Sequence, residues 1–141
     1  EILIPDTYVR NISERLNLYK EINNLKNESD ILSFSKGIKD RFGELPNEIY
    51  RLYDALRIKW LGKKLGFTRV ILKDNKVRAY LPDESNNLFY KSNNFTKILN
   101  FVKKNFNTTE MIKKRNKLCI LVKDVQKIEN AVSIFKDLCD N

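Results

Sequence analysis

One run of residues organises the N-terminal half of this chain: Asp40-Arg41-Phe42-Gly43-Glu44-Leu45-Pro46. Gly43 can adopt the positive φ that ends a helix. Pro46 suits the first turn of a helix, because its missing N–H would have no partner there. Phe42 completes an apolar stripe that precedes the glycine. The run therefore predicts two helices that are joined by a short link and packed as a close pair.

Three helices are predicted around this turn, after an extended segment over residues 2–5. Asn11 is expected to cap the first helix, which runs to about Lys26. Ser29 or Asp30 is expected to cap the second, and Gly66 to end the third. The positions expected to face inward are, helix by helix, Ile12, Leu16, Tyr19 and Ile22; Ile31, Phe34, Ile38 and Phe42; and Ile49, Leu52, Tyr53, Leu56 and Trp60.

The second half of the chain changes from helical to strand periodicity. Residues 67–73 and 76–81 form β-rich runs around Asp74-Asn75, and residues 109–115 and 118–123 form a second pair around Asn116-Lys117. A short edge strand is expected at residues 88–90. One helix follows each hairpin. Asn94 and Asp124 are the expected caps, and the expected inward positions are Phe95, Ile98, Leu99, Val102 and Phe106, then Val125, Ile128, Val132, Phe135 and Leu138.

The predicted fold class is therefore α+β: three N-terminal helices, then a ββα-ββα half whose mostly antiparallel sheet is covered by helices. We expect residues 1–141 to form a single domain, with a helical half (1–66) and a hairpin-and-helix half (67–141). The hydrophobic content of 42% is enough for a core, and no apolar run approaches the length of a membrane span. Because the chain begins with Glu1 and its only methionine is Met111, it is expected to be part of a larger multidomain protein.

The residue types that most often carry chemistry are scarce. The chain has no histidine, and its two cysteines, Cys119 and Cys139, lie far apart in apolar patterns. Neither a zinc site nor a general base of the usual kind is therefore expected. The four glycines are too scattered for a phosphate-binding loop. The sequence predicts no catalytic, cofactor-binding or metal-binding residues in this piece.

The positive charge is concentrated in the second half. The chain carries 27 Lys or Arg against 18 Asp or Glu, and residues 67–141 hold 15 of the basic and 8 of the acidic side chains. Lys113, Lys114, Arg115 and Lys117 gather around one predicted hairpin tip. A nucleic-acid patch is one interpretation, because phosphate contacts need charge but no particular residue order. The other is a solvated surface that keeps strand edges from pairing.

The first half resembles a known family. The pattern Arg15-Leu16-x-x-Tyr19-Lys20-x-Ile22, then Ile38-x-Asp40-Arg41-Phe42-Gly43-x-Leu45-Pro46, is similar to the C-terminal domain of the bacterial transcription-repair coupling factor (Mfd). Ile4-Pro5-x-x-Tyr8, Leu52, Lys59 and Lys64-Leu65-Gly66 fit as well. The resemblance covers about the first half by residues, and beyond Gly66 it is one of element order.

The resemblance implies a regulatory role without catalysis. In that family the domain folds back on the UvrB-like N-terminal module of the same chain and masks the surface that binds UvrA. The whole protein is an ATP-dependent DNA translocase of the bacterial cytoplasm that engages RNA polymerase, UvrA and DNA, and ATP and Mg²⁺ belong to its motor domains alone. No membrane contact is expected.

The resemblance also implies which residues make the contact. Asp40 inherits the family's interdomain role, with Arg41 beside it. Gly37 stands where some relatives carry an acidic residue, so that part of the contact is weaker here or shifts to Glu44 or Glu48. From the residues alone, the other interpretation of Asp40 is an ordinary surface carboxylate that pairs locally with Arg41 or Arg51. The alternative to the regulatory role is a basic nucleic-acid-binding module.

Overall fold

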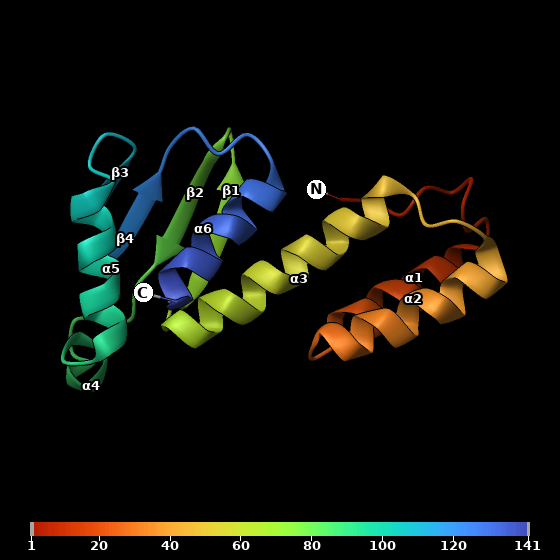
Figure 1. The fold of residues 1–141 in the computed structure, drawn as a ribbon, viewed down its shortest axis with the longest axis horizontal. Helices are drawn as coiled ribbons and strands as arrows, with labels where there is room; N and C mark the ends of the chain where they lie inside the picture. Colours follow the sequence, from red (N-terminus) through yellow and green to blue (C-terminus); the bar gives the residue numbers. More distant parts are fainter. Residues whose placement is uncertain (1, 141) are drawn as a thin grey trace. The chain divides into compact units, whose positions relative to one another are not determined.

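The structure is a computed structural model, and it describes residues 2–140. It confirms the predicted α+β fold, in which helices α1 to α3 precede two repeats of a hairpin followed by a helix (Figure 1). The elements are α1 (Ile12–Asn23), α2 (Glu28–Phe42), α3 (Asn47–Leu65), β1 (Arg69–Lys73), β2 (Lys76–Tyr80), α4 (Asn87–Tyr90), α5 (Asn93–Lys104), β3 (Thr109–Lys114), β4 (Lys117–Val122) and α6 (Ile128–Asp140).

The chain forms two compact units, and the boundary between them falls within α3, between Leu56 and Arg57. We call them the N-terminal unit and the C-terminal unit. The boundary lies ten residues before Gly66, where the sequence changes its periodicity. The organisation of residues 1–141 as one domain stays a prediction.

The first helix of the N-terminal unit begins as predicted, but it buries a different face. The Asn11 side chain accepts a hydrogen bond from the Glu14 N–H at 3.0 Å. Ile12 and Leu16, which were expected inside, are 66% and 55% exposed, so that prediction is wrong. Ile22 is buried as predicted and Tyr19 is partly buried, and Leu18, which was not among the expected residues, is buried as well. The helix carries apolar residues on two overlapping stripes, and tertiary packing selects one of them.

The second helix buries the predicted face but starts at a different cap. Asn27, and not Ser29 or Asp30, lies at the N-cap, and its Oδ1 accepts a hydrogen bond from the Asp30 N–H at 2.8 Å. The Asp30 carboxylate reaches back to the Lys26 N–H at 2.8 Å. The bond from Asp30 N–H to Asn27 satisfies a group that a helix start leaves unpaired, and the bond from Lys26 N–H fixes the chain just before the N-cap, so the helix begins at Glu28. Of the expected inward residues, Ile31 and Ile38 are buried, and Phe34 and Phe42 are partly buried.

The four strands of the C-terminal unit form one antiparallel sheet in the order β1-β2-β4-β3. The first hairpin turns at Asp74 and Asn75, as predicted, and both residues have positive φ. The second turns at Arg115 and Asn116, one residue earlier than predicted, because Lys114 pairs with Lys117 across the strands. Positive φ at both central residues is the geometry that matches the strand twist.

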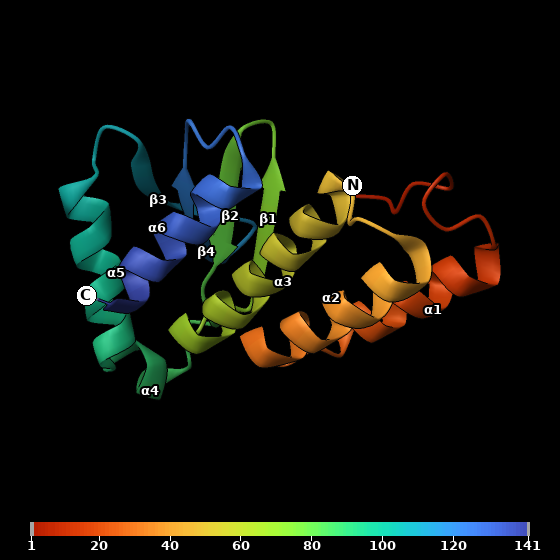
Figure 2. The same cartoon turned by 45° about the vertical axis from the view of Figure 1, so that its right-hand side comes forward.

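The helices of the C-terminal unit lie on one face of this sheet. Both views show α5 and α6 on the same side of the strands (Figures 1 and 2). The core between these layers contains Ile58, Leu65, Phe67, Val77, Ala79, Leu81, Ile98, Ile120, Val122, Val125, Ala131, Val132, Phe135 and Leu138. The predicted layer of helices over an antiparallel sheet is thus confirmed, and alternation along each strand leaves the other residues on the opposite face.

The segment before α5 departs from prediction. Residues 88–90, expected as an edge strand, belong to α4, because the Asn86 side chain accepts from the Phe89 N–H at 3.1 Å and starts a helical turn. The cap of α5 is Ser92, and not Asn94. The Asn94 side chain instead donates to the Lys64 carbonyl at 3.0 Å, near the end of α3.

Two further predictions near the last hairpin are wrong. Phe106, expected inside, is 74% exposed, because α5 ends at Lys104 and the chain turns away. Asp124 does not cap α6, since it adopts a positive φ and lies four residues before the first helical residue, Ile128. The first turn of α6 is closed by Asn130, whose side chain accepts from the Lys127 N–H at 3.1 Å.

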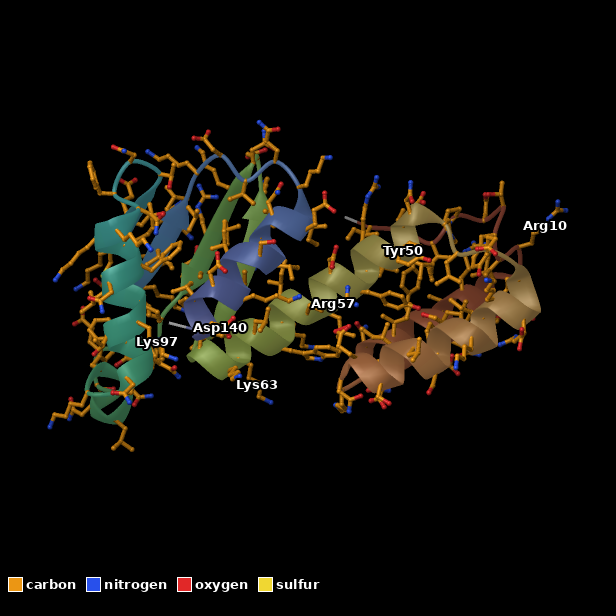
Figure 3. The ribbon with its side chains drawn as sticks, viewed as in Figure 1. Arg10, Tyr50, Arg57, Lys63, Lys97 and Asp140 are labelled. Carbon is orange, nitrogen blue, oxygen red and sulfur yellow. The ribbon has the colours of Figure 1, made fainter. Side chains whose placement is uncertain are left out.

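A lysine from α5 closes the C-terminal end of α6. Lys97 Nζ donates to the carbonyl oxygen of Cys139 at 2.9 Å, and Figure 3 shows Lys97 on α5 beside Asp140 at the end of α6. The last carbonyls of a helix lack intrahelical partners and attract cations. This bond therefore joins two helices that lie over the same side of the sheet.

Candidate functional site

The turn between α2 and α3 has the predicted geometry. Gly43 has a φ of +90°, and its N–H donates to the Lys39 carbonyl at 2.9 Å, which ends α2. Pro46 lies directly before the first residue of α3, and the Ile49 N–H donates to its carbonyl at 3.0 Å. A β-carbon on Gly43 would have open space around it, so the glycine is required by its backbone conformation.

Tyr8 anchors this turn from the start of the chain. Its hydroxyl donates to the Gly43 carbonyl at 2.9 Å, and its ring lies 5.8 Å from the ring of Phe42 between centroids. The pKa of Tyr8 is raised, first by burial and then by Tyr53 and Glu44, so the hydroxyl remains a donor. Sequence analysis found Tyr8 as part of the family pattern but gave it no role. The hydrogen bond joins residues 35 positions apart, and no local pattern reports such a contact.

Asp40 lies on the outer side of α2, within its last turn. Its side chain is exposed, and among residues 2–140 no basic group forms a salt bridge with it. The alternative interpretation, in which Asp40 pairs locally with Arg41 or Arg51, therefore has no support in the described part of the chain. The carboxylate is available for a partner, and the helix and the anchored turn hold its position.

The other predicted contact residues surround Asp40 unequally. The Arg41 guanidinium lies over the Phe42 ring, with Cζ 4.7 Å from the centroid, and this cation–π contact restrains it. Glu44 pairs with Lys39 at 3.1 Å between Nζ and Oε1, although the Glu44 side chain is 83% exposed. Glu48 is partly buried in the first turn of α3. A partner's cation would have to compete with Lys39 for Glu44 but has no such competitor at Asp40.

Gly37 lies three residues before Asp40, on a neighbouring part of the α2 surface. It is exposed, its φ is an ordinary helical one, and an added β-carbon would meet nothing within 4 Å. Neither backbone strain nor crowding therefore requires glycine here.

The predicted basic patch lies in the C-terminal unit, and the hairpin divides it between two faces. Lys113 is two residues after Met111 on β3, so it lies on the same, helix-covered side of the sheet. Its Nζ pairs with Glu84 Oε1 at 2.9 Å. Lys114 and Lys117 are paired across the strands on the other side. Arg115 lies in the turn itself. These four residues are close together in space but do not form one continuous surface.

The other groups that could carry chemistry are weakly placed for it. Cys119 is fully buried and Cys139 is partly buried. Burial raises the pKa of both thiols, which disfavours the reactive thiolate. Among residues 2–140 no three His, Cys, Asp or Glu side chains gather in a way that could hold a metal ion. Within the same range, no helix is long and apolar enough to cross a membrane.

The sequence of this chain matches one protein family. The model of the TRCF domain family matches residues 1–92. The chain is 38% identical over 127 residues to the transcription-repair-coupling factor of Rickettsia prowazekii (strain Madrid E). The matched region covers 89% of this chain and 10% of that protein. It is 32% identical over 68 residues to the transcription-repair-coupling factor of Escherichia coli (strain K12), which covers 48% of this chain and 6% of that protein.

The fold is also similar to a solved one. A crystal structure of the C-terminal domain of a transcription-repair coupling factor superposes with a TM-score of 0.71 at 21% identity, over 98% of this chain and 86% of that one. The chain spans about a tenth of the length of the curated relatives it matches. The similarity to the Rickettsia protein covers most of the chain, so the expectation that resemblance beyond Gly66 is limited to element order is too narrow.

Proposed function

The chain belongs to the TRCF domain family, as the C-terminal domain of a transcription-repair coupling factor, and from this membership we propose that it is a non-catalytic regulatory domain. Its role is to cover the UvrA-binding surface of the UvrB-like N-terminal module of the same protein. The whole protein is an ATP-dependent DNA translocase that works with RNA polymerase, UvrA and DNA in the bacterial cytoplasm, and its motor domains bind ATP and Mg²⁺.

The observation that carries this proposal is the unpaired carboxylate of Asp40. A clamp that must open needs a contact that is specific but modest, and a contact of a few kcal/mol keeps the closed state dominant until a competitor arrives. A carboxylate that is exposed in the free chain and desolvated against a partner's cation contributes about 1.5 kcal/mol or more, whereas a pair that stays exposed contributes only about 0–1 kcal/mol. The helix and the anchored turn fix the backbone at Asp40, so little backbone freedom is lost on docking.

An exposed apolar residue on the same helix supports a docking surface here. Leu32 is 60% exposed and lies eight residues before Asp40 on α2, about two turns along the helix and about 80° around it, so the two border the same exposed part of its surface. Buried apolar contacts at the centre of an interface, with charges at its rim, are typical of specific protein–protein contacts.

Charge reversal at Asp40 tests the proposal directly. We expect Asp40→Arg to weaken binding of this chain to the separately produced UvrB-like module by roughly tenfold or more, because a favourable pair becomes a repulsive one. Titration calorimetry at constant salt measures the affinity. Glu21→Arg is the matched control, because it makes the same charge change on an exposed position of α1 in the same unit.

Equal affinities for the wild type, Asp40→Arg and Glu21→Arg would remove Asp40 from the interface. Failure of the wild-type chain to bind the module at all would reject the masking role. Circular dichroism of each variant checks that the helices remain folded.

The missing acidic residue at position 37 can be restored. We expect Gly37→Glu to tighten binding to the same module by about fivefold, because it places a second carboxylate beside Asp40. Gly37→Ala separates this effect from helix stability, since alanine alone stabilises an exposed helix interior by about 1 kcal/mol. Thermal unfolding and calorimetry on both variants measure the two effects. If alanine and glutamate change the affinity equally, charge at position 37 has no part in the contact.

A further inference from the structure

The face of the sheet away from α5 and α6 carries a set of cations around one tyrosine. Alternation along β2 directs Val77 and Ala79 into the core and therefore Arg78 and Tyr80 to the opposite face. The register places Arg69 of β1 directly opposite Tyr80. We call this surface the open face. In Figures 1 and 2 the helices of the C-terminal unit lie on the other side of the strands.

The second hairpin completes the open face. Tyr80 lies opposite Cys119, and Lys117, two residues before Cys119, is the diagonal neighbour of Tyr80 on the same face. Lys114 is paired with Lys117 across the strands. The register makes Arg78 and Lys114 diagonal neighbours of Cys119 on either side of β4, and both lower the pKa of its thiol against the effect of burial. Cations from β2, β3 and β4 therefore converge on the middle of the face.

The charge on the open face is almost entirely uncompensated. Its one strand carboxylate, Glu110, already has a partner in Lys123, with Nζ and Oε1 3.9 Å apart. Within residues 2–140, no acidic side chain forms a salt bridge with Arg69, Arg78 or Lys117. Such a surface attracts an anion, and the attraction is strongest for a ligand that carries several negative charges.

A hollow opens where these residues meet. It measures about 360 Å³, and it is lined by Thr68, Arg69, Tyr80, Lys114, Arg115 and Lys117. Four of the six lining residues are cations, none is acidic, and Tyr80 is the only aromatic ring. The volume lies at the lower end of small-ligand pockets, which is room for a planar ring with an attached phosphate.

From this arrangement we propose that the open face binds single-stranded nucleic acid, with one base stacked on Tyr80 and the adjoining phosphates held by Arg69, Arg78, Lys114 and Lys117. An unpaired base presents the flat surface that an aromatic side chain stacks on, whereas a duplex hides it. Phosphate contacts and stacking are both tolerant of sequence, so the surface binds without strong base preference. The proposal concerns the C-terminal unit and is independent of docking through Asp40.

Salt dependence is the first measurement. Fluorescence anisotropy of the 141-residue chain with labelled oligo-dT and oligo-U of about 12 nucleotides covers the site sizes of such surfaces. Four phosphate contacts predict a slope of about −2.8 for log affinity against log salt concentration. The affinity should then fall about 50-fold between about 50 and 200 mM salt. Binding of either DNA or RNA supports the proposal.

Neighbouring lysines provide the matched controls. Lys114→Gln should reduce the magnitude of the slope by about 0.7, and Lys114→Gln with Lys117→Gln by about 1.4. Lys113→Gln removes the same charge one residue away, but that side chain lies on the other face beside Glu84, so the slope should not change. Equal effects at positions 113 and 114 would mean that the binding depends only on general surface charge, and this result would overturn the proposal.

Tyr80 separates stacking from charge. Tyr80→Leu should weaken single-strand binding at least about fivefold, whereas Tyr80→Phe keeps the ring and the affinity. Thermal unfolding of both variants shows whether the sheet is intact. Absence of binding at low salt, or a duplex that binds as well as the single strand with no effect of Tyr80→Leu, would overturn the proposal. If the open face instead binds an acidic protein surface, the chain should show no binding of single strands at low salt.

Discussion

Replacement of Phe135 by alanine is expected to lower the free energy of unfolding of the C-terminal unit by about 3–5 kcal/mol. Phe135 is fully buried on α6, and its ring lies 5.6 Å from the ring of Phe67 between centroids. A β-carbon added to Gly62 of α3 would lie 3.7 Å from Cε2 of Phe135, so the ring lies next to this part of α3. The side chain therefore joins α6 to the end of α3 and to the start of the sheet, and its removal leaves a cavity that these three segments line.

Trp60 allows this loss to be measured in the right unit. It is the only tryptophan in the chain and lies in the part of α3 that belongs to the C-terminal unit. Guanidinium unfolding followed by its fluorescence gives the free energy. Phe106→Ala is the control, because the same atoms are removed from a side chain that is 74% exposed, and it should cost no more than about 0.5 kcal/mol. Similar losses for both variants would mean that Phe135 is not part of a close-packed core.

Replacement of Gly66 by alanine is expected to lower the free energy of unfolding of the C-terminal unit by about 2–5 kcal/mol. Gly66 has a φ of +96°, and a left-handed conformation costs a residue with a side chain about 1–2 kcal/mol. An added β-carbon would also lie 2.6 Å from Cε1 of Phe89, so that ring must move. Forced shifts of packed side chains typically cost about 1–3 kcal/mol. Phe89 packs against both Tyr90 and Phe95, so the ring cannot move without disturbing its neighbours.

Gly43 is the matched control for this substitution. Its φ of +90° is nearly the same, but a β-carbon there would meet nothing within 4 Å. Gly43→Ala should therefore show only a backbone cost of about 1–3 kcal/mol, because φ +90° with ψ −166° is a conformation that almost only glycine adopts. Amide hydrogen exchange measures the opening free energy of each unit separately. In Gly66→Ala, the further change Phe89→Leu should recover part of the loss, and strict additivity of the two changes would show that the clash with Phe89 does not contribute.

The features that the sequence predicted correctly depend on neighbouring residues. Gly43 ends a helix and Asp74-Asn75 forms a hairpin turn because of their own backbone preferences. The caps of α2 and α5 were predicted at the wrong residues, and the structure has them at Asn27 and Ser92. In both places several adjacent Asn, Ser and Asp side chains could each cap the helix. Only the final backbone geometry selects among them.

The candidate sites show the same division. The turn that carries Asp40 was found from a short motif, but the hydroxyl of Tyr8 that holds it comes from 35 residues away. Lys113 and Lys114 were grouped because they are adjacent in the sequence, whereas a strand directs adjacent side chains to opposite faces. Period-two alternation was the available signal for separating them, and it requires the strand boundaries to be known.

Local chemistry along the chain was thus enough to predict the α+β class, most helices and hairpins, and the exposed turn at Asp40. Which α1 face is buried, and which cations surround Tyr80, depends on packing and strand register. Arg69, Tyr80 and Lys117 are distant in the sequence and come together because β2 pairs with both β1 and β4. The energy that selects this pairing comes from burying the shared core beneath α5 and α6, and no single segment contains it.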